Sequence, residues 1–276
     1  MIRVLSFLLL ASRLAAQAPP DVAMERAGYM AWLKTAPNSP LLAIAQQKVS
    51  DDGLSLGPRG ADIPLPGIEE YRVSPANGGL IIDGADGKHS LGRGRPYRIG
   101  KYTLYLSGPA PGFLTIFTDE RKKEPPGYYD YDKRFVFVGP LLRSKSATQV
   151  RVLASDGMET LATEVGTVRV PLGGRTSLRV LRIPVAGSEE SELEIFYRDS
   201  TNGRGSYPAG RFVSLIPAGG NTFRLDFNRS RNPYCAYSAV YACPLPWQGN
   251  VINQPVPVGE RYSAAEPEQS AAEDSQ

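Results

Sequence analysis

Apolar and polar residues alternate over much of the chain beyond about residue 52, and this two-residue period constrains the fold more than any other feature. Near the C-terminus, Phe223, Leu225 and Phe227 alternate with Arg224 and Asp226. Successive side chains of a β-strand face opposite sides of its sheet, so the pattern predicts a half-buried strand. Similar segments recur about every ten residues, which is typical of an antiparallel sandwich or barrel.

Turn-forming residues support the same fold class. The chain has 28 glycines and 24 prolines among 276 residues, a proportion that favours many turns between short strands. Asn202-Gly203 is a strong hairpin signal because both residues tolerate positive φ. We therefore expect a mainly β, antiparallel sandwich or barrel-like single domain. Strands do not alternate with long helices, so a doubly wound α/β fold is not expected.

Two short helices are expected before the β region. Asp21 can cap a first helix that runs to about Thr35, and Ser39-Pro40 is a good entry signal for a second. At the other end of the chain, the last residues lack large apolar side chains and should form a disordered acidic tail. The predicted organisation is a signal peptide over residues 1–18, a helical segment over 19–50, a β-rich domain over 51–262 and the tail over 263–276.

The first residues have the pattern of a secretory signal peptide. Arg3 precedes the apolar run Val4–Ala11, and Ala16-Gln17-Ala18 has the small-x-small form of a cleavage site. Cleavage after Ala18 is expected, with Ala16 as the alternative. The apolar run is too short to span a bilayer. The sequence thus predicts export to the periplasm or beyond, and a mature chain without a transmembrane segment.

The two cysteines, Cys235 and Cys243, predict a disulfide, because an even number in an exported chain favours pairing. A reactive thiol is the alternative, but His89 is the only histidine and lies in a predicted surface turn. Two cysteines cannot by themselves form a structural zinc site, which needs four ligands. No metal and no cofactor are therefore expected, apart from a minor route in which Asp226 and Asn228 hold a hard cation such as calcium.

Other function classes find little support. The net charge is only +3 and no run of Lys or Arg exceeds three residues, so nucleic-acid binding is not expected. A Ser-His-Asp triad could use only His89, which lies in a predicted surface turn. Residues 119–133 should form an exposed loop, whose tyrosines either line a ligand groove or pack the loop onto the sheet.

The densest group of polar residues lies near the C-terminus and resembles a known family. The matching motifs are Tyr197–Gly203, Ser206-Tyr207, Gly210–Phe212, Asp226–Asn228, Asn232–Tyr237 and Cys243–Pro246. They are similar, over about residues 190–260, to the motifs of the bacterial family called domain of unknown function 1684. The sequence departs mildly from that pattern at Ser206, Tyr237 and Trp247. The resemblance implies no activity, because the family has none assigned.

Two interpretations of this polar group are open. In the functional one, Arg198, Tyr207, Arg211 and Asn228 line a ligand-binding pocket, where Arg211 can hold a carboxylate or phosphate in a bidentate contact. In the structural one, the arginines pair with Asp199 and Asp226 across strands, and Asn228 and Asn232 tie down the irregular loop that follows. The structural interpretation is preferred for the motif itself.

For the whole protein, the sequence favours a non-catalytic binding protein whose unknown partner is a glycan or a small anionic ligand. The alternative is a hydrolase of glycosidic or ester bonds in which Asp199 and Asp226 are the two carboxylates. Such an enzyme needs its carboxyl groups about 5–10 Å apart across an open cleft.

Overall fold

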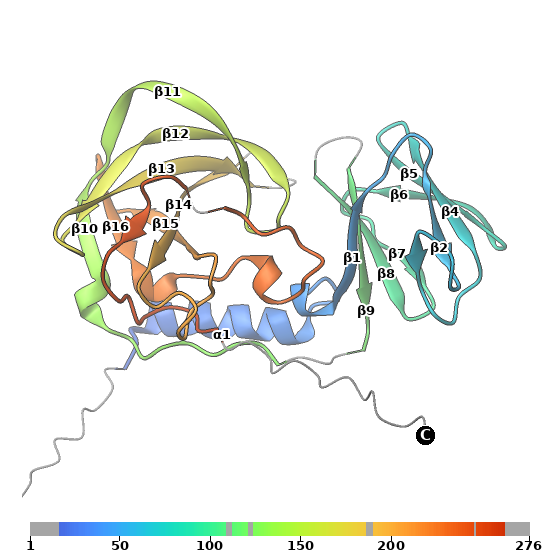
Figure 1. Ribbon diagram of the computed structural model, residues 1–276, viewed down its shortest axis with the longest axis horizontal. Coiled ribbons are helices and arrows are strands. Elements are labelled where there is room, and N and C mark those ends of the chain that lie inside the picture. The colour runs from blue at the N-terminus through green and yellow to red at the C-terminus, as the bar shows by residue number, and fades with distance from the viewer. Residues whose placement is uncertain (1–16, 109–111, 121–123, 186–189, 246, 263–276) are drawn as a thin grey trace, which may run out of the picture.

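The computed structural model describes residues 17–108, 112–120, 124–185, 190–245 and 247–262. Its sheets are antiparallel apart from two short parallel pairings, which confirms the predicted mainly β class. The predicted signal peptide, up to residue 16, and the predicted acidic tail lie outside the described residues. No helix in the described ranges is long and apolar enough to cross a membrane. Figure 1 shows two β bodies side by side, with the helix α1 below the larger one.

The one α-helix of the described residues, α1 (Pro20–Thr35), begins one residue before the predicted cap. Its N-cap is Pro19. Asp21 lies in the first turn, where its negative charge interacts favourably with the positive end of the helix dipole. The second predicted helix was wrong. Ser39 does cap a turn, but the turn is the short 3₁₀ helix η1 (Pro40–Leu42), and the chain continues as the strand β1 (Ala43–Lys48). The reason is tertiary: β1 pairs with β9 and completes a sheet edge.

The smaller β body is a sandwich of two sheets. A four-stranded sheet has the order β1-β9-β8-β7, and a five-stranded sheet has the order β3-β2-β4-β5-β6. Leu104 and Ile116 of the first sheet share one buried core with Leu56, Val73 and Ile82 of the second. The strands are β2 (Leu54–Gly57), β3 (Ile63–Pro64), β4 (Tyr71–Ala76), β5 (Gly79–Gly84), β6 (Gly87–Gly92), β7 (Tyr97–Ile99), β8 (Tyr102–Ser107) and β9 (Phe113–Thr118). His89 lies in β6 and not in the predicted turn, with its Nε2 3.1 Å from Asp86 Oδ2.

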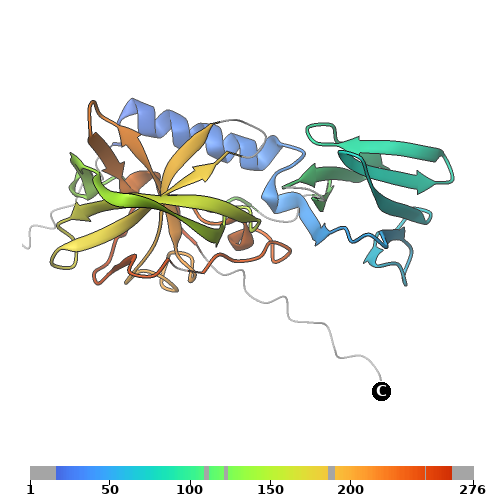
Figure 2. The ribbon, with the colours of Figure 1, turned by 90° about the horizontal axis from the view of Figure 1, so that it is seen from above.

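The larger β body is one curled sheet with the order β10-β16-β15-β14-β13-β12-β11, and a short strand β17 pairs in parallel with β14 (Figures 1 and 2). The strands are β10 (Val136–Pro140), β11 (Leu142–Leu153), β12 (Glu159–Val170), β13 (Thr176–Pro184), β14 (Ser191–Asp199), β15 (Arg211–Pro217), β16 (Thr222–Asp226) and β17 (Val251–Ile252). Three further 3₁₀ helices are η2 (Lys133–Phe135), η3 (Phe227–Arg229) and η4 (Tyr234–Ala236).

Alternation along the strands gives this sheet two buried faces. Ile195 and Tyr197 of β14 point into the main core, which also holds Val213 of β15. Phe196 and Phe212, next to them in the sequence, point the other way and stack with ring centroids 4.4 Å apart. A sheet that is covered on both faces needs a second layer, and here that layer is the C-terminal segment.

A glycine permits the bend of β12. The register between β12 and β13 shifts between Glu164 and Gly166, as at a β-bulge. Gly166 has φ +149°, and a Cβ there would lie 2.2 Å from the carbonyl oxygen of Leu142. The close approach of β11 to β12 therefore depends on the missing side chain.

The two bodies and the helix are joined by specific contacts. Tyr241, from the C-terminal loop, packs in one cluster with Leu42 and Phe117 of the smaller body. Ser238 Oγ donates a hydrogen bond to the carbonyl of Ala43, at 2.8 Å. Figure 2 shows α1 lying along the larger body and pointing toward the smaller one. The loop that carries the two cysteines is thus part of the junction.

Candidate functional site

The central pair of the C-terminal motif is an ion pair with no exposure to solvent. Arg211, at the start of β15, lies opposite Tyr197 of β14, and its Nη2 is 2.8 Å from Oδ2 of Asp199. Both side chains are 0% exposed. The guanidinium also lies over the ring of Tyr197, 5.5 Å from its centroid. Sequence alternation explains this placement, because Tyr197 and Asp199 share one face of β14.

Hydrogen bonds surround both partners of the pair, and among the described residues only the Nε of the Arg211 guanidinium has no acceptor. Arg211 donates to the carbonyls of Val256 (2.8 Å) and Val258. Asp199 Oδ1 accepts from the backbone N–H and hydroxyl of Thr201 (2.8 and 2.6 Å) and from the N–H of Val256 (3.1 Å). Buried charges need such partners to offset their lost hydration. The pair therefore fastens the C-terminal segment to the end of β14.

The second predicted carboxylate, Asp226, serves a separate local network. Its Oδ1 accepts from the backbone N–H and the side-chain amide of Asn228, at 3.0 and 2.9 Å. Asn228 in turn bonds both backbone groups of Asp132, at 2.9 and 3.0 Å. Its carbonyl accepts from Nη2 of Arg26 in α1, at 2.8 Å. Asp226 and Asn228 thus hold together η3, α1 and the loop that carries Tyr128, Tyr129 and Tyr131, which we call the tyrosine loop.

The tyrosine loop packs onto the protein. The guanidinium of Arg26 lies over the ring of Tyr128, 4.6 Å from its centroid. The N–H of Tyr129 donates to the carbonyl of Gly259, at 2.9 Å. Burial raises the pKa of Tyr128 well above its usual value. Of the two predicted roles of these tyrosines, the contacts support the packing role.

A third buried network was not found from the sequence. Glu260 is fully buried, accepts from the N–H of Asn232 (2.6 Å) and from the hydroxyl of Tyr237 (2.7 Å), and Tyr237 meets Tyr29 of α1 at 3.1 Å. Burial raises the pKa of Glu260 to about 7, although the bonds from Asn232 and Tyr237 act in the opposite direction. Glu260 follows a glycine in an irregular segment, where no periodicity marks a buried residue.

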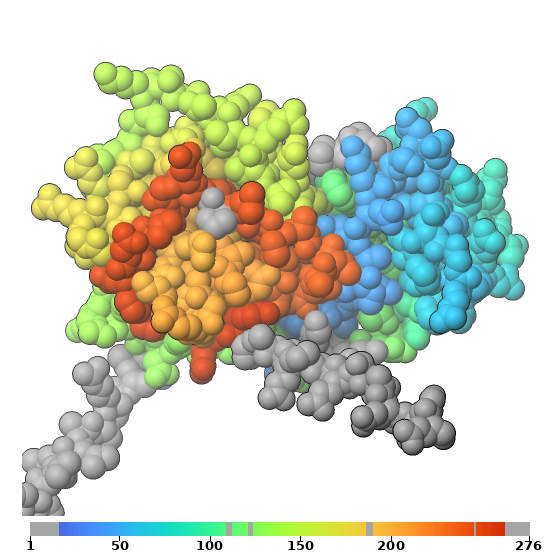
Figure 3. Space-filling view, in the orientation of Figure 1, coloured from blue at the N-terminus to red at the C-terminus, as the bar shows by residue number. Residues whose placement is uncertain are grey.

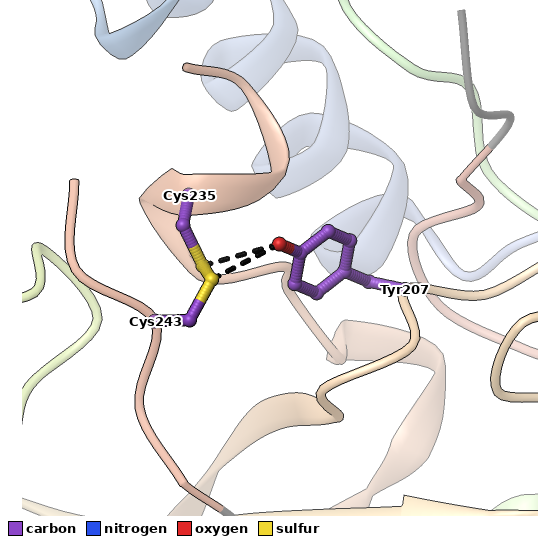
Figure 4. The surroundings of a disulfide bond; sticks show 3 residues. All are labelled: Tyr207, Cys235 and Cys243. Carbon is purple, nitrogen blue, oxygen red and sulfur yellow. Dashed lines mark hydrogen bonds between the residues drawn. A yellow bond between two sulfur atoms is a disulfide. The ribbon is translucent and has the colours of Figure 1, made fainter. Parts of the chain in front are cut away.

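The cysteines form the predicted disulfide. Cys235 and Cys243 are bonded, with their Cα atoms 5.5 Å apart. Figure 4 shows Tyr207 with its hydroxyl against the bridge, 3.3 Å from Sγ of Cys235 and 3.1 Å from Sγ of Cys243. A thiol that is bonded in this way is not a free nucleophile, so the pair acts as a covalent brace of the junction loop.

The predicted site residues are therefore divided among several places. Asp199 lies with Arg211, and Asp226 lies with Asn228. Tyr207 is half-buried beside the disulfide, and the side chain of Arg198 is exposed at the end of β14. In the described ranges, no ion pair or hydrogen bond joins the Asp199 group to the Asp226 group. A ligand-binding or catalytic role for these residues stays a prediction, and their contacts fit the structural interpretation.

Within the described ranges, no three His, Cys, Asp or Glu side chains gather closely enough to hold a metal ion. Asp226 and Asn228, the pair considered for a hard cation, bond each other and Asp132.

A concave site lies elsewhere, on the outer face of the curled sheet. A pocket of about 400 Å³ lies between β11, β12, β13 and the segment around Trp247. Figure 3 shows the C-terminal segment, coloured red, running over the larger body below β11 and β12. The pocket is lined by Val150, Arg151, Val152, Leu153, Glu159, Arg179, Leu181, Leu245, Trp247 and Gln248. Sequence reasoning missed it because its residues come from distant segments without a shared motif.

The pocket combines an apolar wall with a charged rim. Trp247 packs against Phe196 and Phe212, with centroids 6.2 Å from each, so the indole is fixed from behind. Arg179 Nη2 is 2.5 Å from Glu164 Oε2, and its Nη1 donates to the carbonyl of Gln248 at 3.3 Å.

The second rim arginine is held less firmly. Arg151 and Glu159 form an ion pair of 2.6 Å whose side chains are 77% and 57% exposed. Exposed pairs of this kind contribute only about 0–1 kcal/mol, so Arg151 is free to change partner.

The fold and the motif define a β protein that is organised around a buried Arg–Asp pair and a disulfide-braced loop. Residues 126–261 match the family described as Protein of unknown function (DUF1684), and this part of the chain belongs to that family. The match confirms the resemblance seen over residues 190–260 and extends it upstream to the tyrosine loop. No curated protein matches the chain.

One similar solved structure is the solution NMR structure of the uncharacterized protein from gene locus rrnAC0354 of Haloarcula marismortui. The two sequences are 30% identical over 51% of this chain and 78% of that chain. The TM-score is 0.43.

Replacing Arg211 by Met should lower the free energy of unfolding by about 3–5 kcal/mol, because Asp199 would remain buried without its partner. The matched control is Arg198→Met, an exposed arginine on the neighbouring strand β14, which should change stability by less than about 0.5 kcal/mol. Urea unfolding followed by circular dichroism measures both variants. Equal effects of the two substitutions would refute the anchoring role of the pair.

Stability should also depend on Glu260 between about pH 5 and pH 8. Its folded-state pKa of about 7 lies above the unfolded value of 4.5, so the folded chain binds the extra proton in this window. The contribution of Glu260 to the free energy of unfolding is therefore fully present below pH 4.5, and it is lost as the pH rises through 7. Glu260→Gln should flatten the fall in urea midpoint from pH 5 to pH 8, and an unchanged slope would contradict this assignment.

Proposed function

We propose that this protein is a non-catalytic binding protein and that its ligand is a small molecule with an anionic group on an apolar body. The observation that carries the proposal is the 400 Å³ pocket on the outer face of β11–β13, with apolar side chains as its wall and Arg151, Arg179 and Glu159 at its rim. Ligand sites are commonly concave, mostly apolar and provided with a few polar groups that orient the ligand.

The charges at the rim support an anionic group rather than a cationic one. Arg179 is held in place by Glu164 and by the carbonyl of Gln248, so it is oriented before a ligand arrives. Arg151 is held only by an exposed pair with Glu159 and is able to turn toward an incoming anion. A carboxylate or phosphate accepts hydrogen bonds from guanidinium groups in a bidentate manner.

The alternative, a hydrolase that uses Asp199 and Asp226, has less support. Asp199 is enclosed with Arg211, and its Oδ1 already accepts three hydrogen bonds. Asp226 is 2% exposed and accepts from Asn228. Carboxylates that flank a scissile bond must face a substrate across an open cleft, and neither of these faces the pocket described above.

We also propose that the protein is exported. The signal-like pattern of residues 1–18 and the bridge between Cys235 and Cys243 both favour an oxidising compartment.

The pocket is tested in the Trp32→Phe variant, which leaves Trp247 as the only tryptophan. Dodecanoate should shift the emission of Trp247 and bind at micromolar concentration, whereas dodecyltrimethylammonium, with the same chain and opposite charge, should bind at least tenfold more weakly. Val150→Phe, which fills the pocket, should abolish the shift. Val138→Phe, on an exposed site of β10, is the matched control. Equal binding of the two detergent ions, or binding that survives Val150→Phe, would reject the proposal.

Export is tested by expressing the full chain in a bacterium and fractionating the cells. The mature protein should appear outside the cytoplasm with no titratable thiol and with its N-terminus at Pro19 or Gln17. Leu8→Arg, which breaks the apolar run, should retain the uncleaved chain in the cytoplasm, and Leu8→Ile should not. Uncleaved, reduced wild-type protein in the cytoplasm would contradict export.

A further inference from the structure

The disulfide lies directly before the residues that form one wall of the pocket. Cys243 precedes Leu245 by two positions, and Leu245, Trp247 and Gln248 all line the pocket. We call these three residues the wall segment. The bridge ties the start of the wall segment to Cys235, so the position of the pocket wall is connected to the state of the two cysteines.

The end of the wall segment is held by Asn250, which is fully buried. Its side-chain oxygen accepts from the backbone N–H of Arg179, at 2.7 Å. Its side-chain nitrogen donates to the carbonyls of Arg179 and Phe196, both at 3.0 Å. These three bonds do not involve the bridge, so the end of the wall segment keeps its place whether or not the cysteines are bonded.

The start of the wall segment has no comparable anchor apart from the bridge. In the part of the chain that the structure describes, residues 242–245 make no hydrogen bond through their backbone. Leu245 is 82% exposed, so packing holds it weakly. Cys235, by contrast, lies in η4, where the N–H of Tyr234 donates to the carbonyl of Ser155 at 2.7 Å. Opening the bridge would therefore release the start of the wall segment and leave Cys235 in place.

The bridge is accessible to a reductant from one side. Cys243 is exposed, whereas Cys235 is half-buried. The hydroxyl of Tyr207 donates to the bridge, at 3.3 Å from Sγ of Cys235 and 3.1 Å from Sγ of Cys243 (Figure 4). Burial raises the pKa of Tyr207, so this donor keeps its proton at neutral pH. Exposed bridges are more readily reduced than enclosed ones, and a stabilised leaving thiolate speeds exchange.

We propose that this disulfide controls the pocket, so that the bridged protein binds the anionic ligand and the reduced protein binds it much more weakly. The inference rests on the proposed function, because it concerns the regulation of the same pocket. The contacts of the junction loop alone do not require it. Tyr241 and Ser238 meet the smaller body from within the loop, and neither the exposure of Cys243 nor the donor from Tyr207 contributes to those contacts.

The reductant is a dithiol. One of its thiolates attacks the exposed Sγ of Cys243, the bond between the two cysteine sulfurs breaks, and Cys235 leaves as a thiolate beside the Tyr207 hydroxyl and takes up a proton. The second thiol of the reductant then displaces Cys243, which becomes a thiol in turn. Two electrons pass to the cysteines, and the dithiol leaves as its own disulfide.

The experiment measures dodecanoate binding to the full chain carrying Trp32→Phe, by the emission of Trp247, with and without dithiothreitol. The reduced protein should bind dodecanoate at least tenfold more weakly. The double variant Cys235→Ser and Cys243→Ser should bind as weakly with or without dithiothreitol. The matched control is Ser238→Ala, which removes a contact of the same loop but leaves the bridge, and it should keep its affinity within twofold.

The outcomes separate this inference from the proposed function. Equal binding by the bridged and reduced proteins would overturn the control by the bridge alone, whereas no binding by the bridged protein would reject both. Loss of the circular dichroism signal on reduction would also overturn it, because unfolding would then explain the weaker binding.

The route of exchange has its own measurement. Tyr207→Phe keeps the ring but removes the donor to the leaving sulfur, so dithiothreitol should reduce the bridge at least threefold more slowly at the same pH. Titration of free thiols over time gives the rate. An unchanged rate would overturn the role of Tyr207 and the route through Cys243.

Discussion

The buried bond between Arg211 and Asp199 is the interaction on which the larger β body depends. Removing two charges from water costs several kcal/mol per ion, so the pair is stable only because other groups complete its hydrogen bonding. Those groups are the backbone of Val256 and Val258 and the side chain of Thr201. The pair therefore holds Val256 and Val258 against the main core, whereas Trp247, earlier in the same C-terminal segment, covers the other face of the sheet and forms one side of the pocket.

Around this bond, the motif residues each join segments that are distant in the sequence. Asn228 connects η3 with the tyrosine loop and α1, and Glu260 connects the C-terminal segment with Tyr237 and, through it, with Tyr29. The disulfide braces the loop that meets the smaller β body. Ordered loops without regular backbone pairing need such side chains, which gives the family's motif a physical reason that does not involve catalysis. Any ligand would then be met on other surfaces.

Much of the fold and part of the site were predictable from local patterns. Strand alternation gave the β class, because the period of two reflects the alternating directions of side chains on a strand. The two cysteines gave the bridge, and the Arg–Asp composition of the motif suggested a structural pair before the geometry was known. The second helix failed because Ala43–Lys48 has a partner strand in β9, a contact that helix-start signals at Ser39 and Pro40 do not encode.

By itself, the sequence determined which residues are buried on each strand, which cysteines pair, and that the chain contains the motif of its family, because these properties follow from neighbours within a few residues or from residue type. Only the tertiary structure decided where the concave surface lies. The pocket brings β11 and β13 against the segment around Trp247, which are distant in the sequence. The curl of the sheet creates this pocket, and that curl arises from strand pairing and from the close approach permitted at Gly166.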